Sequence, residues 1–228
     1  MQPYFFPYIG YFQLINSVDE FVIYDNIQYT KKGWINRNRI LLNGKDTLFT
    51  VPLKKDSDFL DVVNREISKD WIKNRVKVLN QIKSSYKKAP FFNDVFPLVE
   101  KCIINEESNL FKFIYDSLSY INDFLGIKTK IIISSSIDMN HELKSKDKVI
   151  EICKKLNSDN YINSIGGMEL YDKEEFKKSG IELKFIKSNQ IVYEQFSDNF
   201  IPWLSIIDVM MFNSKDKLNE YLKNYTLI

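Results

Sequence analysis

The first forty residues place a helix signal, a strand signal and a polar loop in close succession, and this order constrains the fold more than any other feature. Apolar residues after Pro7 recur at near-helical spacing up to Val18, which predicts a helix. Residues 21–24 form a short apolar run that ends at Asp25, which predicts a buried strand. In open α/β sheets, ligands bind just beyond the carboxyl ends of the strands. We therefore expect a ligand site immediately after this first strand.

The rest of the chain predicts a hairpin, a helical stretch and then alternating strands and helices. Asn43-Gly44 separates two apolar runs and suits a tight hairpin turn. Three amphipathic segments follow within residues 71–125, and Gly126 ends the third. We then expect a strand at 128–134, a helix at 147–156, a strand at 160–163, a helix at 174–179 and a last strand at 181–186. This order predicts an α/β fold with a Rossmann-like, mainly parallel sheet covered by helices.

The predicted domain organisation follows from the same order. The β-hairpin and the helical stretch at 71–125 interrupt the alternation, so we interpret residues 71–125 as a helical insertion within a single domain of residues 1–228. The chain has 32 basic and 30 acidic residues, and its net charge of +2 gives no general attraction for nucleic acid or for an anionic membrane. No apolar run approaches the roughly 20 residues that span a bilayer. The N-terminus lacks the features of a signal peptide, so we expect a cytoplasmic protein.

Cysteine and histidine are too few for several kinds of catalytic site. Cys102 and Cys153 lie in helical patterns, and we expect buried free thiols. The single histidine, His141, lies in a polar run and is expected to be a loop residue without a chemical role. One histidine argues against a catalytic triad and against a multi-histidine metal site. The sequence predicts no metal site, and it identifies no cofactor.

Residues 1–11 form the first candidate binding segment. Gln2 and Tyr4 leave the expected sheet edge, and two prolines stiffen the connection to the helix. In nucleotidylyl-transferase-type α/β folds, a similar loop and helix start carry an HxGH-like signature over phosphates. By fold-level analogy, Tyr8 and Tyr11 stand where those histidines would be. The alternative is an aromatic cluster that only packs the helix on the sheet.

The polar loop after the first strand is the second candidate segment. Arginine side chains fit phosphate or carboxylate, and a tryptophan face suits a base or sugar ring. Asp25 could orient a lysine or remove a proton from an attacking amine. We take Asp25 and Lys32 as candidate catalytic residues, and the candidate substrate-binding residues here are Gln28, Trp34, Asn36, Arg37 and Arg39. The alternative is a charged hairpin flank that only faces water.

Two later segments complete the candidate site. Gly166 and Gly167 follow a predicted strand and can turn backbone N–H groups toward a ligand oxygen near Tyr171, although a plain turn is equally consistent. Asp208 is a carboxylate inside an apolar run, and burial there requires a partner, for which an arginine of residues 36–39 is a natural choice. The alternative is a helix capped by Ser205, with Asp208 in its first turn.

Several long motifs resemble the WbqC-like family, which takes its name from a protein encoded in bacterial O-antigen clusters. The motifs are MQPYFFPYIGYFQLI, YDNIQYTKKGWINRNRI, YINSIGGMELYDKEEFKKSGIELKFI, YEQF and LSIIDVMMFN. The resemblance runs nearly end to end and implies a role in surface-polysaccharide (lipopolysaccharide) assembly. Family members carry a few apolar residues before MQP, so it also implies that the first strand of the sheet is missing here or was lost to a shifted start site.

The leading hypothesis is a transferase that forms an amide on an amino sugar nucleotide by acyl or aminoacyl transfer. Its partners would be a nucleotide sugar and an acyl donor. In this hypothesis Asp25 is the base or the orienting group, and backbone N–H groups near Gly166 and Gly167 stabilise a developing oxyanion. Phosphates are held by Lys32, Arg37 and Arg39, and Trp34 stacks on a ring. One alternative is a non-catalytic nucleotide-binding protein with a degenerate pocket, which the missing histidines favour. A second is a cysteine-dependent acyltransferase that uses Cys102 or Cys153.

Overall fold

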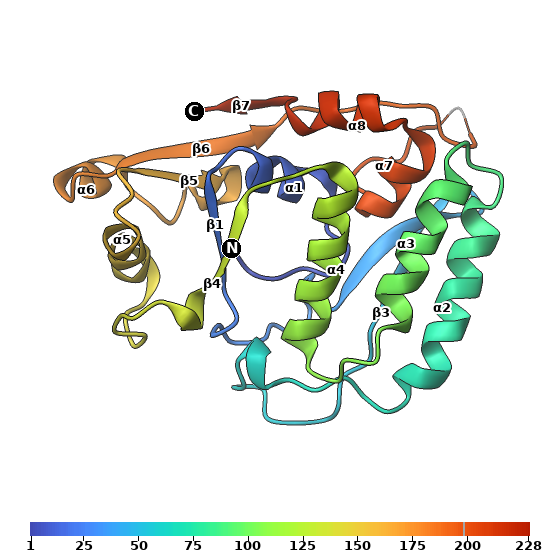
Figure 1. Ribbon diagram of the computed structural model, residues 1–228, viewed down its shortest axis with the longest axis horizontal. Coiled ribbons are helices and arrows are strands. Elements are labelled where there is room, and N and C mark those ends of the chain that lie inside the picture. The colour runs from blue at the N-terminus through green and yellow to red at the C-terminus, as the bar shows by residue number, and fades with distance from the viewer. Residues whose placement is uncertain (198) are drawn as a thin grey trace.

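The computed structural model describes residues 1–197 and 199–228 as a mixed α/β fold (Figure 1). Its elements, in chain order, are α1 (Ile9–Asn16), β1 (Glu20–Ile23), β2 (Arg37–Leu42), β3 (Lys45–Thr50), α2 (Trp71–Tyr86), α3 (Phe92–Ile104), α4 (Leu110–Leu125), β4 (Lys130–Ile133), α5 (Ser145–Lys155), β5 (Asn160–Ser164), α6 (Lys173–Lys178), β6 (Glu182–Ser188), α7 (Ile206–Phe212), α8 (Lys215–Leu222) and β7 (Tyr225–Leu227). The elements predicted up to residue 186 are present near their expected positions. The strand that we predicted at residues 181–186 corresponds to β6. It is not the last strand, as we had expected, because β7 follows it.

Local sequence signals account for several element ends. Asn43 and Gly44 both have positive φ, 51° and 72°, and they join β2 to β3 in the expected hairpin. The side chain of Asn109 accepts a hydrogen bond from Lys112 N at the start of α4, and Gly126 ends that helix in the left-handed conformation. These ends depend on neighbouring residues alone, which is why the sequence predicts them well.

The strands form three small sheets in place of the single sheet that we expected. β1 pairs with β4 in parallel, β2 pairs with β3 in an antiparallel hairpin, and β6 pairs in parallel with β5 and antiparallel with β7. Parallel pairs are therefore present, but the described residues do not join them into one Rossmann-like sheet. The two parallel pairs lie toward the centre and the α6 side of the molecule, while α2, α3 and α4 stand together on the other side (Figure 1).

The division between the parallel pairs lies beside Met1. The Met1 amino group donates to Val22 O at 2.7 Å, and Tyr24 N donates to Met1 O at 2.8 Å, so Met1 lies along β1. Burial lowers the pKa of the Met1 amino group to about 5. Beyond Met1, residues of β1 and β5 line a shared cavity of about 540 Å³. This cavity separates the β1–β4 pair from the β5–β6 pair.

Two hydrophobic clusters lie on the two sides of this division. The larger one joins the N-terminal segment to the helices of residues 71–125, as the Phe5 and Phe113 rings show with centroids 5.1 Å apart. The smaller one packs α5 and α6 on β5 and β6 around Phe176 and Phe185. No helix within residues 1–197 or 199–228 is long and apolar enough to cross a membrane.

Candidate functional site

A polar cluster lies at the carboxyl ends of β1 and β4, where the parallel pairing brings together two loops that are far apart in the sequence. We call it the carboxyl-end cluster and define it as Asp25, Asn26, Ser134, Ser135, His141 and Lys148. β1 delivers the first two residues, the 3₁₀ turn after β4 delivers the two serines, and α5 delivers the lysine. We predicted a ligand site at this position from the sequence, but Asp25 was the only residue of the cluster among the predicted site residues.

Asp25 is fully engaged by the residues that follow β4. Its Oδ1 accepts from the Ser134 hydroxyl at 2.9 Å and from Ser135 N at 3.0 Å, and its Oδ2 accepts from the Ser135 hydroxyl at 2.6 Å. The side chain is buried, with 2% of its surface exposed. Because three donors hold both carboxylate oxygens, the geometry suits Asp25 as an orienting group better than as a base.

Asn26 connects the serines to the two other members of the cluster. Its Oδ1 shares the single Ser134 hydroxyl proton with Asp25, at an oxygen–oxygen distance of 2.6 Å, and accepts from Lys148 Nζ at 3.3 Å. Its Nδ2 lies 3.0 Å from His141 Nδ1, and His141 Nε2 lies 3.0 Å from Ile137 O. A carbonyl oxygen only accepts, so His141 Nε2 donates to Ile137 and Nδ1 accepts from Asn26. The single histidine is thus a fixed support for Asn26, a role that the sequence did not predict.

Lys148 supplies the amine of the cluster. Its Nζ lies 5.3 Å from the centre of the Tyr24 ring as well as near Asn26. Burial lowers the pKa of Lys148, and the carboxylates of Asp61 and Asp25 oppose that effect. A lysine with a lowered pKa is more readily neutral and can take up a proton. We did not predict this role from the sequence, because the helical pattern of α5 identifies only its apolar face.

A second group lies at the other end of the N-terminal segment, and we call it the aromatic–arginine group: Tyr8, Trp34, Arg39 and Trp203. The Arg39 guanidinium carbon lies 5.4 Å from the centre of the Trp34 ring. Its Nη2 donates to Trp203 O at 3.3 Å, and its Nη1 pairs with Asp46 at 2.8 Å. Its Nε is buried without a hydrogen-bond partner among the described residues. Arg39 therefore lies beside Trp34 and the backbone of Trp203, with one donor still unused.

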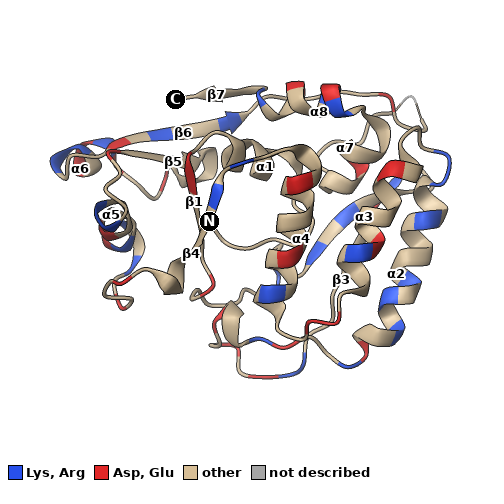
Figure 2. Cartoon of the chain, in the orientation of Figure 1, with Lys and Arg blue, Asp and Glu red and all other residues tan. Residues whose placement is uncertain are grey.

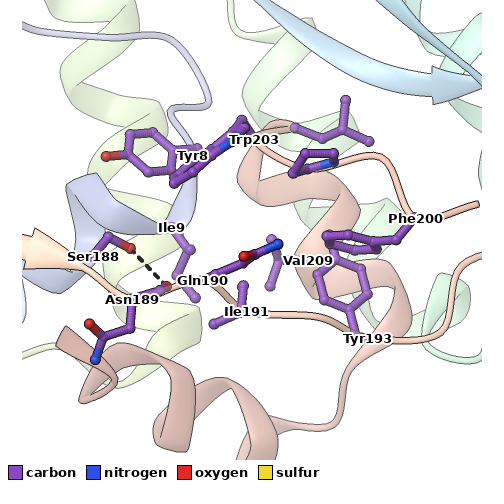
Figure 3. Close-up of a pocket in the computed structure, with 12 residues that line it drawn as sticks. Tyr8, Ile9, Ser188, Asn189, Gln190, Ile191, Tyr193, Phe200, Trp203 and Val209 are labelled. Atoms are coloured by element: carbon purple, nitrogen blue, oxygen red, sulfur yellow. Dashed lines mark hydrogen bonds between the residues drawn. The ribbon is translucent and has the colours of Figure 1, made fainter.

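Trp203 is exposed on a strained backbone. Its φ is +61°, which is rare for a residue other than glycine, and 55% of its surface is exposed. The Tyr8 ring meets it edge to face, with centroids 5.6 Å apart (Figure 3). Beneath these rings is a small cavity of about 30 Å³ lined by Ile9, residues 188–191 and Val209, among others. That volume holds a water molecule, so a larger ligand would bind over the rings.

The N-terminal segment links the two groups. Met1 pairs with Tyr24 at one end, and Phe5 N donates to Ile35 O at 3.0 Å beside Trp34. Between them the Tyr4 hydroxyl donates to Gln2 Oε1 at 3.1 Å. An extended chain spans at most about 24 Å over seven residue steps, which limits the distance from Met1 to Tyr8. Gln2, Tyr4 and Tyr8 lie on the N-terminal segment, Trp34 directly precedes Ile35, and Arg39 lies in β2. That they form one binding surface stays a prediction.

Four other candidate residues have different surroundings. Lys32 is exposed, and Gln28 donates to Asp58 O at 3.0 Å. Arg37 Nε donates to Gly33 O at 2.8 Å and so fixes the loop that carries Trp34. Asn36 is buried, accepts from the Tyr29 hydroxyl at 2.8 Å and donates to Val51 O at 2.7 Å. Asn36 therefore holds the loop to β3, and its side chain is not directed at a ligand.

The glycine pair after β5 has a packing explanation. A Cβ on Gly167 would meet the side-chain amide of Asn163, so the turn needs a glycine there. A Cβ on Gly166 would meet open space. Tyr171 packs on Phe176 and Tyr161, with its ring centroid 5.6 Å and 6.3 Å from theirs. These contacts place Tyr171 in the smaller hydrophobic cluster.

Asp208 is buried and paired, but not with the arginine that we expected. It accepts from the Tyr86 hydroxyl at 2.8 Å, the Tyr193 hydroxyl at 2.6 Å and Gln195 Nε2 at 2.8 Å. Burial raises the pKa of Asp208, and the three donors oppose that rise. Ser205 accepts from Ile207 N at 3.2 Å and caps α7, so the capping interpretation is confirmed as well.

The two cysteines are buried free thiols, as predicted. Burial raises the pKa of Cys102 to about 12 and that of Cys153 to about 11. The nucleophilic form of cysteine is the thiolate, and a pKa this high leaves almost none of it near neutral pH. The geometry therefore argues against a cysteine-dependent acyltransferase.

Comparison with known proteins adds a family but no established activity. The sequence model of the WbqC-like protein family matches residues 2–220. An uncharacterised protein of Mycobacterium tuberculosis is 28% identical over 227 residues, which covers 98% of this chain and 96% of that protein. No solved structure matches the chain.

Proposed function

The chain belongs to the WbqC-like protein family, and we propose that it is a transferase that forms an amide on the amino group of an amino sugar nucleotide. The donor would be an activated acyl or aminoacyl group, such as a thioester. The process would be the assembly of bacterial surface polysaccharide, including O-antigen. This proposal rests on the site described above and on the context from which the family takes its name.

One observation carries the binding part of the proposal: a guanidinium lies beside the exposed Trp34 indole and the backbone of Trp203, whose own indole is exposed. Arg39 contacts the Trp34 ring and the Trp203 backbone, and its Nε has no partner among the described residues. An arginine fork fits a phosphate, and an indole face fits a base or a sugar ring. We assign the phosphate contact to Arg39 because it lies beside the Trp34 ring, and a phosphate there would take the place of the Asp46 carboxylate on Nη1. Arg37 donates to Gly33 through Nε and supports the loop that carries Trp34.

The carboxyl-end cluster supplies the chemical part of the proposal. The sugar amine attacks the acyl carbonyl carbon, a C–N bond forms, and the bond from that carbon to the donor's leaving group breaks. The attacking nitrogen must lose a proton, and we assign its acceptance to Lys148, which lies beside Asn26 and whose pKa is lowered by burial. Asn26 holds Lys148, and Asp25 holds Ser134, which contacts Asn26. Asp25 is a positioning residue in this scheme.

The test is turnover measured by mass spectrometry. Amino sugar nucleotides are incubated with a panel of acyl and aminoacyl thioesters, and the product gains the mass of the acyl group. We expect Lys148→Ala to lower turnover by roughly 100-fold or more without a change in nucleotide affinity. Lys154→Ala, an exposed lysine on the same helix, is the matched control. Equal activity of the two variants would rule out the role of Lys148.

Nucleotide binding is tested separately by calorimetry. Trp34→Ala should weaken the binding of a sugar nucleotide by about tenfold, since base stacking contributes roughly 1–3 kcal/mol. Phe59→Ala is the control, because Phe59 is an exposed aromatic residue in another loop, with 84% of its surface exposed. Unchanged affinity in Trp34→Ala would contradict a ring-binding role for this surface.

A second candidate is a nucleotide-binding protein without catalytic activity. It is favoured by His141, whose two ring nitrogens are occupied by Asn26 and Ile137, and by the tyrosines at positions 8 and 11. Neither arrangement offers a histidine for acid–base chemistry. Tight nucleotide binding without mass gain over the whole donor panel would favour this second function.

A further inference from the structure

Helix α2 and the turn after it carry a concentration of positive charge that the candidate site does not use. Residues 71–93 contain no acidic residue and six basic ones: Lys73, Arg75, Lys77, Lys83, Lys87 and Lys88. The whole chain has a net charge of only +2, so the remainder is net negative. Blue segments run along α2 at the outer side of the molecule (Figure 2). The charge of the chain is therefore unevenly distributed, although its total is nearly balanced.

These six cations lack acidic partners within the described residues. Seven ion pairs are present elsewhere, and they use other lysines and Arg39. In contrast, Arg75 donates to the Ile104 carbonyl at 2.9 Å, and Lys83 lies 6.0 Å from the centre of the Phe96 ring. No carboxylate in residues 1–197 or 199–228 comes within 4.0 Å of the charged atoms of the six. Their charge is thus available to an external anionic partner.

The same helix exposes aliphatic side chains among its lysines. Ile72 and Val76 are one helical turn apart, with 61% and 56% of their surfaces exposed. Lys73 and Lys77 follow them directly in the sequence and are also exposed. The buried face of α2 belongs to the larger hydrophobic cluster and lies about a quarter turn around the helix from Ile72 and Val76. An exposed aliphatic strip between this buried face and a row of lysines is a surface that folding alone does not explain.

We propose that α2 docks on the surface of an anionic lipid bilayer. Groups of four to eight basic residues on an amphipathic helix are typical of anionic-lipid binding. Ile72 and Val76 enter the boundary between headgroups and acyl chains, and the lysine stems extend so that their ammonium groups contact lipid phosphates. A nucleic acid is the less suitable partner, because five of the six cations are lysines and the exposed apolar residues are aliphatic, so they offer no ring on which bases stack.

The test is co-sedimentation with vesicles at low salt. The full chain is mixed with vesicles of phosphatidylcholine alone or of phosphatidylcholine and phosphatidylglycerol in equal parts. We expect sedimentation only with the anionic vesicles, and we expect it to weaken at 0.15 M salt, where the Debye length is about 8 Å. Lys73→Glu combined with Lys77→Glu should lower the partition coefficient by roughly 30-fold or more, since each lysine near an anionic surface contributes about fivefold.

Two further variants separate the contributions. Ile72→Ser combined with Val76→Ser keeps every charge and should lower partition by about tenfold, because it removes the inserted side chains. Lys177→Glu combined with Lys178→Glu makes the same charge change at exposed positions on α6 and should leave partition within about twofold. Circular dichroism confirms that each variant is folded.

Three results would overturn the proposal. The first is the absence of sedimentation with anionic vesicles at low salt. The second is an equal loss in the α2 and α6 charge variants, which would indicate net charge rather than a docking face. The third is binding to double-stranded DNA without binding to vesicles, which would assign the α2 surface to nucleic acid.

Discussion

Replacing Asp208 by asparagine tests the buried network that joins α2, α7 and the loop before α7. The substitution keeps the shape of the side chain and one oxygen for the Tyr86 hydroxyl. It replaces the other oxygen, which accepts from Tyr193 and Gln195, with an NH₂ group. The Tyr193 hydroxyl can rotate to accept from that group. Gln195 cannot turn its amide without losing both of its contacts with Ile201. The new NH₂ group at position 208 and the Nε2 of Gln195, both hydrogen-bond donors, are therefore left facing each other.

The size of the effect follows from these contacts. Hydrogen bonds to a charged group contribute about 1.5–3 kcal/mol each, and removal of the buried charge offsets part of the loss. We therefore expect the free energy of unfolding to fall by about 3 kcal/mol, measured by urea denaturation. Asp216→Asn, at an exposed position in the first turn of α8, should change it by less than about 0.5 kcal/mol.

The pH dependence gives a second measurement on the same variant. Burial raises the folded pKa of Asp208 above its ordinary value of 3.8, so the folded chain binds this proton more tightly than the unfolded chain. The stability contributed by the protonated carboxyl is complete below 3.8 and is lost as the pH rises through the folded pKa. In Asp208→Asn, the free energy of unfolding should not show this decrease as the pH rises. A variant as stable as the wild type, with the same pH profile, would refute the reasoning.

Two further predictions concern the aromatic–arginine group. Trp203→Gly should relieve a left-handed backbone and raise the free energy of unfolding by about 1 kcal/mol, while sugar-nucleotide affinity measured by calorimetry falls about tenfold. If affinity stays the same, Trp203 is not part of a ligand surface. Gly10→Ala should add about 0.5 kcal/mol to the stability of α1, yet its Cβ would meet the Tyr8 ring and displace it from Trp203. Tryptophan fluorescence measures that displacement, and an unchanged emission spectrum would contradict it.

The sequence predicted those parts of the fold that depend on near neighbours. The Asn43-Gly44 turn and the Gly126 helix end follow from local backbone preferences, and the structure confirms both. The division of the sheet could not be predicted in this way. It depends on which strand edges meet across the chain, and Met1 occupies the edge of β1 next to the cavity. Periodicity identifies a strand but does not select its partner.

The same distinction applies to the candidate site. Asp25 was predicted because it directly follows a strand, and Trp34 and Arg39 because they share one polar loop. Lys148 was missed, since it comes near Asn26 only in the folded chain and the two residues are 122 positions apart in the sequence. For Asp208, the sequence showed a buried carboxylate but pointed to an arginine. The tyrosine donors come from α2 and from residue 193, and no local pattern connects those positions.

The backbone strain at Trp203 is the strongest structural reason to place a ligand at the aromatic–arginine group. Phe6 and Trp203 both have positive φ, and they flank a junction in which Ser205 donates to Phe6 O at 2.8 Å and to Arg39 O, through its amide, at 2.9 Å. Phe6 is fully buried, so core packing compensates for its strain of roughly 1–3 kcal/mol. Trp203 is more than half exposed, so packing compensates for much less of its backbone strain. A strained, exposed tryptophan beside a guanidinium is an arrangement that ligand contact would explain and that the packing of the described residues does not.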